Sequence, residues 1–301
     1  MQNWQPGDRP VVSICCATFN HEPYIAKAIE GFLMQETDFP FEIVIRDDCS
    51  TDHTADIVRR YAERYPHIIR TFFEEENTYS KGVKAMQAIF KLARGEYIAI
   101  CEGDDYWTDP MKIQKQVDFL SRHDDYVLTY TAAEAFDENG VVENYSGGVR
   151  RDVEAIELQK TIPINTLTTC FRNVIRDFPP EFGGTRFGDL FLWSLLGAYG
   201  KGKFLEDIRP ARYRMHAGGV FSKQSVAEKQ KMAYLTRMAL YMYYYRLDNK
   251  ELSDYFHKNV INFSLRYYGA LYYIKIVVKH ILSRNKFIKE LLALRKRDNA
   301  E

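Results

Sequence analysis

Short apolar runs alternate with runs of helical periodicity along the first hundred residues of the chain. The apolar runs, which are typical of buried strands, occupy residues 11–18, 41–45, 68–73 and 97–101. The helix-like runs between them occupy residues 22–35, about 51–65 and about 82–93. This alternation predicts an α/β fold in which helices cover both faces of a mostly parallel central sheet. In such folds ligands gather beyond the carboxyl ends of the strands.

The alternation continues more loosely after residue 107. A helix is predicted from Thr108 to about Arg122, with Pro110 near its start, and a strand from Tyr126 to Ala132. Asn139-Gly140 marks a turn, for which a hairpin is one interpretation. From about Ser222 the chain becomes helical and rich in tyrosine and then basic, which indicates a domain boundary near residue 220.

Composition narrows the class of protein. The 301 residues are 46% hydrophobic, enough for a large core, and the totals of Lys+Arg and Asp+Glu are both 41. A formal net charge of zero gives no attraction to nucleic acid, so we expect no such partner. The cysteines form no CxxC pair, and neither a signal peptide nor a long apolar run is visible, which favours a cytoplasmic protein with reduced thiols.

The most informative segment is Glu102-Gly103-Asp104-Asp105, which follows the fourth predicted strand. Carboxylates crowded on a turn offer oxygen ligands of the kind that Mg²⁺ and Mn²⁺ prefer. A diphosphate can complete the coordination of such an ion. Aspartates are also common turn formers before a helix, so the residues alone leave both interpretations open.

Polar groups also follow the other three predicted strands. The segment from Arg46 to Asp52 opens a helix, where a carboxylate could bind a nucleobase or ribose, and where Ser50 or Thr51 could equally be an ordinary helix cap. Residues 17–22 leave the first strand, and residues 77–82 leave the third. Four strand ends therefore carry side chains suited to one ligand site.

These segments resemble the family 2 inverting glycosyltransferases, which have the GT-A nucleotide-sugar-binding fold. The resemblance rests on VSICCATFNHEPYI, EIVIRDDCSTDHT and GEYIAICEGDDYWTDPMKIQKQVDFL, with GDLFLW and YRMHAGGV further along. It implies a Rossmann-like GT-A catalytic domain over residues 1–220. The nucleotide-sugar half would cover about 10–107 and the acceptor half about 108–220, and residues 221–301 would form a helical, basic extension.

The resemblance also implies roles for individual residues. Those expected to hold the nucleotide are Thr18, Asn20, Glu22, Asp48, Lys81 and Asp104, with Lys84 as an alternative to Lys81 on the diphosphate. Asp104 would be the principal ligand of a Mn²⁺ or Mg²⁺ ion. Glu102 departs from the aspartate usual at its position, so it would contact the ion through water or face the ribose. His216 would complete the metal site, or it is a structural histidine.

An inverting transfer needs a base on the acceptor side of the sugar. The resemblance implies Asp189 as this base, whereas the residues alone favour a helix N-cap, and Glu181 is the reserve. Trp107 and Trp193 are candidate stacking surfaces for an acceptor sugar, with core packing as the alternative.

Residues 274–297 combine a recurring apolar face with many Lys and Arg residues. Such a helix suits the surface of an anionic membrane, although a helix packed on the catalytic domain has the same pattern. Contact with the inner face of the cytoplasmic membrane would suit a lipid-linked acceptor.

The sequence therefore predicts a metal-dependent inverting glycosyltransferase. The expected donor is a UDP-sugar, and the expected acceptor is a hydroxyl of a glycan or a lipid-linked glycan. A noncatalytic nucleotide-sugar-binding scaffold subunit and a sugar nucleotidyltransferase are the alternatives, although the glycine-rich phosphate loop usual for the latter is missing.

Overall fold

The computed structural model describes residues 9–143, 145, 147–219 and 224–268. The chain divides into two compact units, Met1–Ala239 and Leu240–Glu301. The first unit carries every residue that the sequence predicts for a ligand site. The proposed division into a domain of residues 1–220 and a basic extension stays a prediction.

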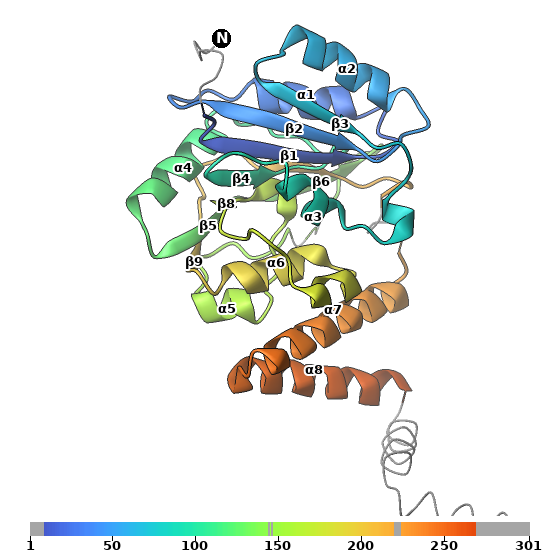
Figure 1. The fold of residues 1–301 in the computed structure, drawn as a ribbon, viewed down its shortest axis with the longest axis vertical. Coiled ribbons are helices and arrows are strands. Elements are labelled where there is room, and N and C mark those ends of the chain that lie inside the picture. Colours follow the sequence, from blue (N-terminus) through green and yellow to red (C-terminus); the bar gives the residue numbers. More distant parts are fainter. Residues whose placement is uncertain (1–8, 144, 146, 220–223, 269–301) are drawn as a thin grey trace, which may run out of the picture. The chain divides into compact units, whose positions relative to one another are not determined.

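A seven-stranded sheet forms the centre of the first unit (Figure 1). In spatial order its strands are β3 (Ile69–Phe73), β2 (Phe41–Asp47), β1 (Val12–Thr18), β4 (Tyr97–Ile100), β8 (Cys170–Arg172), β5 (Tyr126–Tyr130) and β9 (Lys201–Phe204). All are parallel to one another except β8, which runs antiparallel to both of its neighbours. The mostly parallel α/β fold predicted from the sequence is confirmed.

Helices flank this sheet, as the sequence predicts. In the first unit they are α1 (Ile25–Leu33), α2 (Thr54–Arg64), α3 (Ala85–Phe90), α4 (Lys112–Arg122), α5 (Ala155–Gln159), α6 (Gly188–Leu196) and the first part of α7 (Val226–Arg246). The apolar positions of α1 at Ile25, Ala28, Ile29 and Phe32 are fully buried. Helical spacing of apolar residues thus identified the face that packs on the sheet.

A second, three-stranded sheet lies beside the acidic turn. Its order is β10 (Ala211–Arg214), β6 (Ala133–Asp137) and β7 (Gly140–Val141). The β6–β7 hairpin confirms the turn predicted at Asn139-Gly140, where Gly140 has a φ of 121°. A bridge between Tyr106 and Arg212 joins β10 to the residue after the acidic cluster. This bridge brings the segment around His216 to the carboxyl edge of the main sheet.

One predicted helix is shorter than its sequence pattern. Residues 82–93 were expected to be helical, but α3 covers only Ala85–Phe90 and a 3-10 turn precedes it at Tyr79–Lys81. Gly82 has a φ of 88°, a left-handed conformation that ends the 3-10 turn, and Lys84 is extended. The break frees the Lys84 side chain from a helix face.

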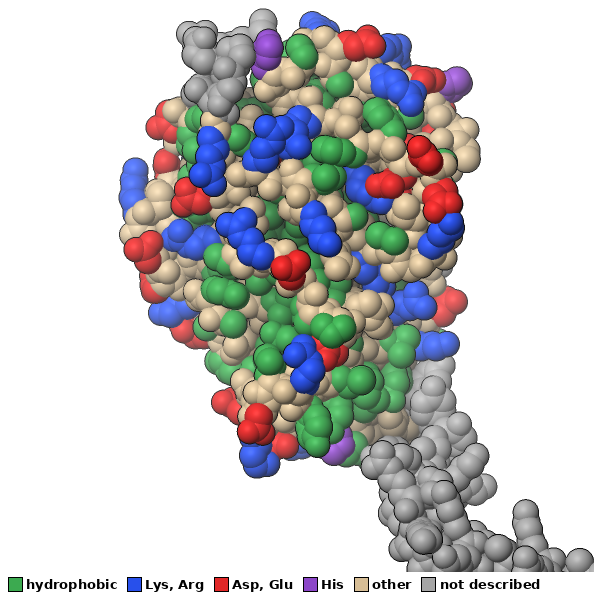
Figure 2. All heavy atoms as spheres, viewed as in Figure 1, with side chains coloured by type: hydrophobic (Ala, Val, Ile, Leu, Met, Phe, Trp, Pro, Cys, Tyr) green, Lys and Arg blue, Asp and Glu red, His purple; other side chains and the backbone are tan. Residues whose placement is uncertain are grey.

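The second unit contains the end of α7 and helix α8 (Lys250–Tyr268). The rings of Tyr244 and Phe256 stack there with centroids 5.8 Å apart. Residues 274–297, the predicted membrane-binding segment, lie outside the described residues. No helix among the described residues is long and apolar enough to cross a membrane. Basic and acidic side chains are interspersed on the face of the molecule drawn in Figure 2.

Candidate active site

The acidic turn packs closely against the carboxyl end of β1. The Gly103 amide donates to the Ala17 carbonyl at 3.1 Å, and the Cys101 amide donates to the Cys15 carbonyl at 3.2 Å. A Cβ atom at Gly103 would lie 2.7 Å from Thr18 Oγ1 and 2.9 Å from His21 Nδ1. A side chain at this position would therefore displace both groups, so glycine permits the close approach.

Asp104 lies between two histidines. Its Oδ2 atom is 3.0 Å from Nε2 of His216 and 3.8 Å from Nε2 of His21. Burial raises the pKa of Asp104, but the hydrogen bond with His216 and the charge of His21 outweigh this effect and lower it. The structure thus brings together two residues that the sequence predicts, and it adds His21, which follows β1 in the quoted FNHEPY segment.

The surroundings of the other two carboxylates of the turn, Glu102 and Asp105, favour their neutral, protonated forms. Burial, followed by the charge of Asp104, raises the pKa of Glu102 to about 7, and Glu102 Oε2 accepts from Thr166 Oγ1 at 3.0 Å. Burial and the neighbouring charges of Asp104 and Glu102 raise the pKa of Asp105 well above its usual range. Its Oδ1 atom accepts from the Arg214 amide at 2.7 Å. The turn therefore concentrates its negative charge on Asp104.

Two buried polar atoms beside this turn, Thr18 Oγ1 and His21 Nδ1, have no hydrogen-bond partner among the residues that the structure describes. A buried polar group without a partner costs free energy of folding, so its retention points to a ligand. Thr18 was predicted from the sequence to bind the nucleotide, and its side chain stands next to Asp104 through Gly103. The carboxyl end of β1 therefore carries buried polar groups whose hydrogen bonds are not supplied by the described residues.

Asp104 and His216 form a donor pair that fits a divalent cation. No group of three His, Cys, Asp or Glu side chains among the described residues is arranged to hold a metal ion. Mg²⁺ and related ions, however, are commonly held by one or two protein ligands while phosphate oxygens and water fill the other positions. Glu102, the third predicted ligand, is instead hydrogen-bonded to Thr166.

Asp48 lies at the end of the neighbouring strand β2, and its amide donates to the Thr18 carbonyl at 3.0 Å. Its Oδ1 accepts from the Thr78 amide at 3.1 Å, and its Oδ2 accepts from the Tyr79 amide at 3.0 Å. Burial raises the pKa of Asp48, but the hydrogen bonds from Thr78 and Tyr79 lower it overall. Asp48 is therefore an ionised acceptor in a fixed orientation.

Phe19 was not singled out from the sequence. It lies between Thr18 and Asn20, and its side chain is 40% exposed. A large exposed ring directly after Thr18 offers a flat apolar surface for a planar ligand group. Its signal in the sequence was its place directly after the first strand.

Asn20 and Glu22 join the loop after β1 to the loop after β2. Asn20 Oδ1 accepts from the Thr51 amide at 2.8 Å, and Glu22 Oε2 accepts from the His53 amide at 3.1 Å. Asn20 also has a φ of 53°, which asparagine tolerates better than most residues. The nucleotide contacts predicted for these two side chains stay a prediction, and their present contacts shape the site.

The two lysines after β3 differ in their contacts. Lys81 is 57% exposed and forms an ion pair with Glu76. Lys84 reaches the loop before α6, where its Nζ donates to the Thr185 carbonyl at 2.7 Å. The ion pair of Lys81 is thus exposed to solvent, whereas Lys84 holds the loop before α6.

Asp189 lies in the first turn of α6. Burial raises its pKa to about 6, against which the backbone amides of Leu190 and Asp189 act only partly. Its charge is also felt by Glu102, whose pKa it helps to raise. The predicted base is therefore electrostatically coupled to Glu102, and its raised pKa suits a proton acceptor.

The expectation that Trp107 and Trp193 form an acceptor surface is contradicted by their burial. Their exposed fractions are 2% and 0%. The Trp107 indole donates to the Leu167 carbonyl at 2.7 Å, and the Trp193 indole donates to the Ile164 carbonyl at 3.2 Å. Both rings are core residues: the Trp107 ring packs edge-on against Phe32 with centroids 5.1 Å apart, and the Trp193 ring lies edge-on to Phe171 at 6.3 Å.

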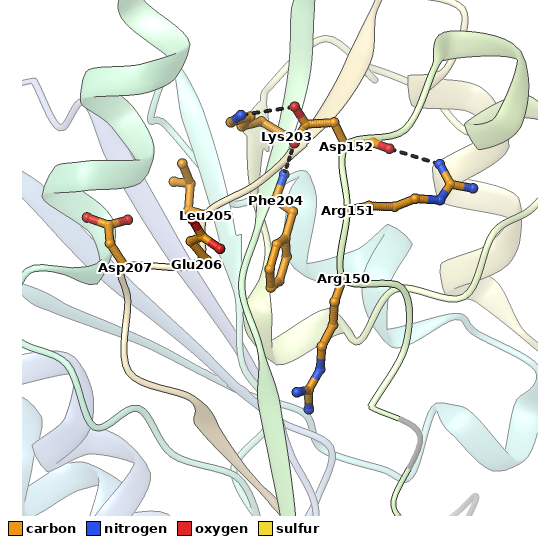
Figure 3. A pocket seen from close by; sticks show the side chains of 8 residues that line it. All are labelled: Arg150, Arg151, Asp152, Lys203, Phe204, Leu205, Glu206 and Asp207. Atoms are coloured by element: carbon orange, nitrogen blue, oxygen red, sulfur yellow. Dashed lines mark hydrogen bonds and ion pairs between the residues drawn. The ribbon is translucent and has the colours of Figure 1, made fainter.

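A hollow of about 420 Å³ elsewhere in the first unit contains none of the predicted site residues (Figure 3). It is lined by Arg150, Arg151, Asp152 and the segment from Lys203 to Asp207. Asp152 binds Lys203 Nζ at 2.9 Å and the Phe204 amide at 3.0 Å, so its charges are largely used within the lining. We assign no ligand to this hollow.

Comparison with known proteins agrees with the geometry. The model of the family described as Glycosyl transferase family 2 matches residues 13–179. An uncharacterized protein of Mycobacterium tuberculosis is 35% identical over 215 residues, which is 70% of this chain and 60% of that protein. The chain thus spans about 60% of the length of this relative. A putative glycosyltransferase of Bacillus subtilis, EpsE, is 34% identical over 44% of this chain and 46% of its own length.

Two solved structures share the fold. Staphylococcus aureus TarS 1-349 in complex with UDP-GlcNAc has a TM-score of 0.59 at 21% identity, covering 85% of this chain and 73% of that chain. A mannosyltransferase of Pyrobaculum calidifontis in complex with GDP-Man and Mn²⁺ has a TM-score of 0.57 at 16% identity, covering 98% and 82%. At these identities the similarity establishes the GT-A fold.

Proposed function

Because the chain belongs to glycosyl transferase family 2, we propose that it transfers a sugar from a UDP-sugar to a hydroxyl of a glycan or lipid-linked glycan acceptor. The transfer is a single displacement that inverts the anomeric carbon. The observation that carries the proposal is the convergence of Asp104, His216 and His21 beside two unpartnered buried atoms.

The donor's nucleotide lies along the carboxyl ends of β1 and β2. Asp48 is ionised and held by backbone amides, so it can accept a hydrogen bond from an N–H or O–H group of the nucleoside. Phe19 supplies a ring against which a base can stack. Thr18 Oγ1 and Lys81 are the nearby groups for ribose and phosphate. Neighbours of this fold bound to UDP-GlcNAc and GDP-Man support a nucleotide-sugar donor.

Asp104 and His216 would hold a Mn²⁺ or Mg²⁺ ion, and the ion would offset negative charge on the departing nucleoside diphosphate. The bound Mn²⁺ in the mannosyltransferase of similar fold supports this assignment. Without the ion, His216 and His21 place positive or donor groups around Asp104 and keep its carboxylate ionised. The histidines therefore maintain the charge that a cation requires.

Asp189 removes the proton of the acceptor hydroxyl as the new glycosidic bond forms. Its pKa of about 6 leaves the carboxylate ionised at neutral pH, yet more basic than an exposed aspartate. The acceptor would approach from the side of α6. A lipid-linked acceptor at the inner face of the membrane rests on the basic segment 274–297 of the sequence.

A thermal-shift titration with UDP, dTDP, GDP and CMP tests the donor site. Each nucleotide is added with Mn²⁺ and with chelator to wild type, Asp104→Ala and the control Asp124→Ala, whose carboxylate is fully exposed. We expect stabilisation by UDP of about 2–3 kcal/mol at a hundredfold excess over Kd, only with Mn²⁺, in wild type and the control. Stabilisation that survives in Asp104→Ala, or none with any nucleotide, would contradict the proposal.

Turnover separates this function from its alternatives. Release of UDP from UDP-sugars in the presence of acceptor or water, lost in Asp104→Ala, marks a transferase. Metal-dependent binding without turnover against any acceptor pool would instead indicate a scaffold. Release of pyrophosphate from a nucleoside triphosphate and a sugar phosphate would indicate a nucleotidyltransferase.

A further inference from the structure

One peptide unit of the loop before α6 is held from both sides. The carbonyl of Thr185 accepts from Lys84 Nζ at 2.7 Å. The amide of Arg186, which belongs to the same peptide unit, donates to Thr236 Oγ1 at 3.1 Å. The carbonyl and the amide of a trans peptide point in opposite directions, so the two side chains grip this plane between them.

The same threonine also holds the residue at which α6 begins. Thr236 Oγ1 accepts from the Phe187 amide at 2.9 Å and donates to the Met232 carbonyl at 3.1 Å. Its exposed fraction is 0%, and it comes from the part of α7 that belongs to the first unit. Phe187 is the N-cap residue of α6 and makes no side-chain capping bond, so Thr236 supplies a partner for a helix end that lacks its own cap.

The Thr185–Arg186 peptide lies three residues before Asp189, and the Phe187 amide that Thr236 also holds lies two residues before it. A rotation of the Thr185–Arg186 peptide would turn the first helical residues of α6, and with them the carboxylate. General-base catalysis depends on this orientation, because an error of 1 Å in placement can lower a rate by about a hundredfold. The position of the base is thus fixed by residues from α7 and from the segment before α3.

Lys84 ties this grip to the donor half. It follows the segment in which Asp48 binds the amides of Thr78 and Tyr79. The left-handed Gly82 then turns the chain so that Lys84 is extended and crosses to Thr185. Hydrogen bonds at both ends of the segment 78–84, from Asp48 at one end and to Thr185 at the other, therefore connect the proposed nucleotide-binding carboxylate to the loop that carries the base.

We propose that Thr236 and Lys84 are positioning residues for Asp189, which they act on through the Thr185–Arg186 peptide. The inference rests on the proposed function, since it assigns Asp189 as the base. In this proposal neither residue is assigned a contact with donor or acceptor, and Lys84, the alternative ligand for the diphosphate, binds the Thr185 carbonyl instead. Thr236 lies outside the segment matched by the family model, residues 13–179, so a helix beyond that segment takes part in organising the site.

The test compares Thr236→Val with Thr236→Ser. Valine keeps the shape and removes the hydroxyl, whereas serine keeps the hydroxyl. The matched control is Thr129→Val, because Thr129 is equally buried and donates to the Cys170 carbonyl at 3.0 Å, away from α6. For each variant the kcat of glycosyl transfer, the Kd of the donor and the melting temperature are measured.

We expect Thr236→Val to lower kcat by about 30- to 100-fold with the donor Kd within about twofold of wild type. Thr236→Ser should restore kcat to within about threefold, and Thr129→Val should lose stability but keep kcat. Lys84→Met should lower kcat in the same direction as Thr236→Val. Hydrogen exchange at the Phe187 amide should be faster in Thr236→Val and return to the wild-type rate in Thr236→Ser.

The outcomes separate this inference from the proposed function. Equal kcat in wild type and Thr236→Val, with wild-type turnover intact, would overturn the positioning role and leave the transferase standing. A loss of kcat that Thr129→Val shares would also overturn it, because the effect would then follow from stability alone. Absence of turnover in wild type with every donor would overturn the transferase itself and the role of Asp189 with it.

Discussion

Buried carboxylates lie at both edges of the central sheet, at the amino ends and at the carboxyl ends of its parallel strands, but the two clusters differ in how far their polar groups are hydrogen-bonded. At the amino edge, the carboxylate of Glu42 is surrounded by donors. At the carboxyl edge, three carboxylates occur within four residues, and two buried polar atoms have no hydrogen-bond partner in the described part of the chain. Both edges are built on β1, β2 and β4, so the difference is not one of architecture.

The amino-edge cluster is complete. Glu42 Oε1 accepts from Ser13 Oγ at 2.7 Å and from the Arg94 amide at 2.8 Å, and its Oε2 accepts from Arg70 Nη1 at 2.7 Å. The Gly95 amide donates to Ser13 Oγ at 2.8 Å. Every polar group here is used by the fold, which is what a structural cluster requires.

The carboxyl-edge cluster is crowded and incomplete. Burial and then like charges raise the pKa values of Glu102 and Asp105, and one buried polar atom of Thr18 and one of His21 have no hydrogen-bond partner among the described residues. Such an arrangement lowers the stability of the folded chain, whereas a bound cation and diphosphate would satisfy it. The two edges differ in whether their buried polar groups have hydrogen-bond partners within the fold. This property, rather than the number of polar groups, distinguishes a binding site from a structural cluster.

The largest expected effect comes from removing the charge at the centre of the carboxyl edge. Asp104→Asn should lower the transfer rate by about a thousandfold or more, since the variant loses the carboxylate for the cation. Its free energy of unfolding should change little, because a like charge beside Glu102 and Asp105 disappears together with the hydrogen bond to His216. Steady-state turnover and urea unfolding check both parts. Full activity in Asp104→Asn would contradict the assignment of the carboxyl edge as the active site.

Two glycine-to-alanine variants should have different effects at the two edges. The variant at the amino edge should lose stability, and the variant at the carboxyl edge should lose donor affinity. At Gly95 a Cβ would lie 2.5 Å from the Ser13 amide nitrogen and 2.9 Å from the Tyr97 carbonyl oxygen, both backbone atoms. We expect Gly95→Ala to destabilise the fold by about 3 kcal/mol or more.

At Gly103 the added atom would meet side-chain atoms of Thr18 and His21, which can move. Gly103→Ala should therefore stay folded while its donor Kd rises by about tenfold, a loss of about 1.4 kcal/mol of binding. Thermal melting and donor titration measure the two quantities. Equal melting temperatures for the two variants would contradict the assignment of the edges.

A matched pair of acid-to-amide changes gives a smaller effect. Glu42→Gln places an NH₂ group against one of its present donors and should cost about 2 kcal/mol of unfolding free energy. Glu102→Gln should cost less than about 0.5 kcal/mol at neutral pH, because Glu102 titrates near pH 7 and its bond from Thr166 can be kept. Chemical denaturation of both variants beside wild type decides the point. A larger loss in Glu102→Gln would mean that the crowded edge contributes to stability after all.

The sequence identified the elements of the sheet better than it identified the contacts of single side chains. Apolar periodicity placed β1, β2, β3 and β4 within two residues, because burial in a parallel sheet demands continuous apolar runs. The pairing of Asp104 with His216 depended on a resemblance, since 112 positions separate them and no local rule joins them.

Other assignments failed or were missed for physical reasons. Aromatic type alone could not tell that Trp107 and Trp193 are fully enclosed, since a stacking surface and a core residue share the same chemistry. The sequence pattern did not predict the contacts of Thr236, because a threonine within a helix gives no indication of the distant amides from which its hydroxyl accepts hydrogen bonds. His21 belongs to the motif VSICCATFNHEPYI, but its partner Asp104 is distant in the sequence, so no local pattern predicted their contact.

The last prediction concerns Asp189, whose titration should appear in both stability and rate. Burial raises its pKa from the ordinary 3.8 to about 6, so between these values the folded chain holds a proton that the unfolded chain has released. The resulting stabilisation is present in acid and is lost as the pH rises through about 6. Wild type should therefore gain about 1–2 kcal/mol relative to Asp189→Asn when the pH falls from about 7.5 to about 4.5.

The rate should move in the opposite direction. A base must be ionised, so transfer by wild type should fall on acidification with an apparent pKa near 6. Asp189→Asn should have no such limb and should retain its donor affinity. Glu42→Gln, as the control from the amino edge, should keep the wild-type pH profile at reduced stability. A limb near pH 6 that persists in Asp189→Asn would assign the base elsewhere on the carboxyl edge, with Glu102 as the first group to examine.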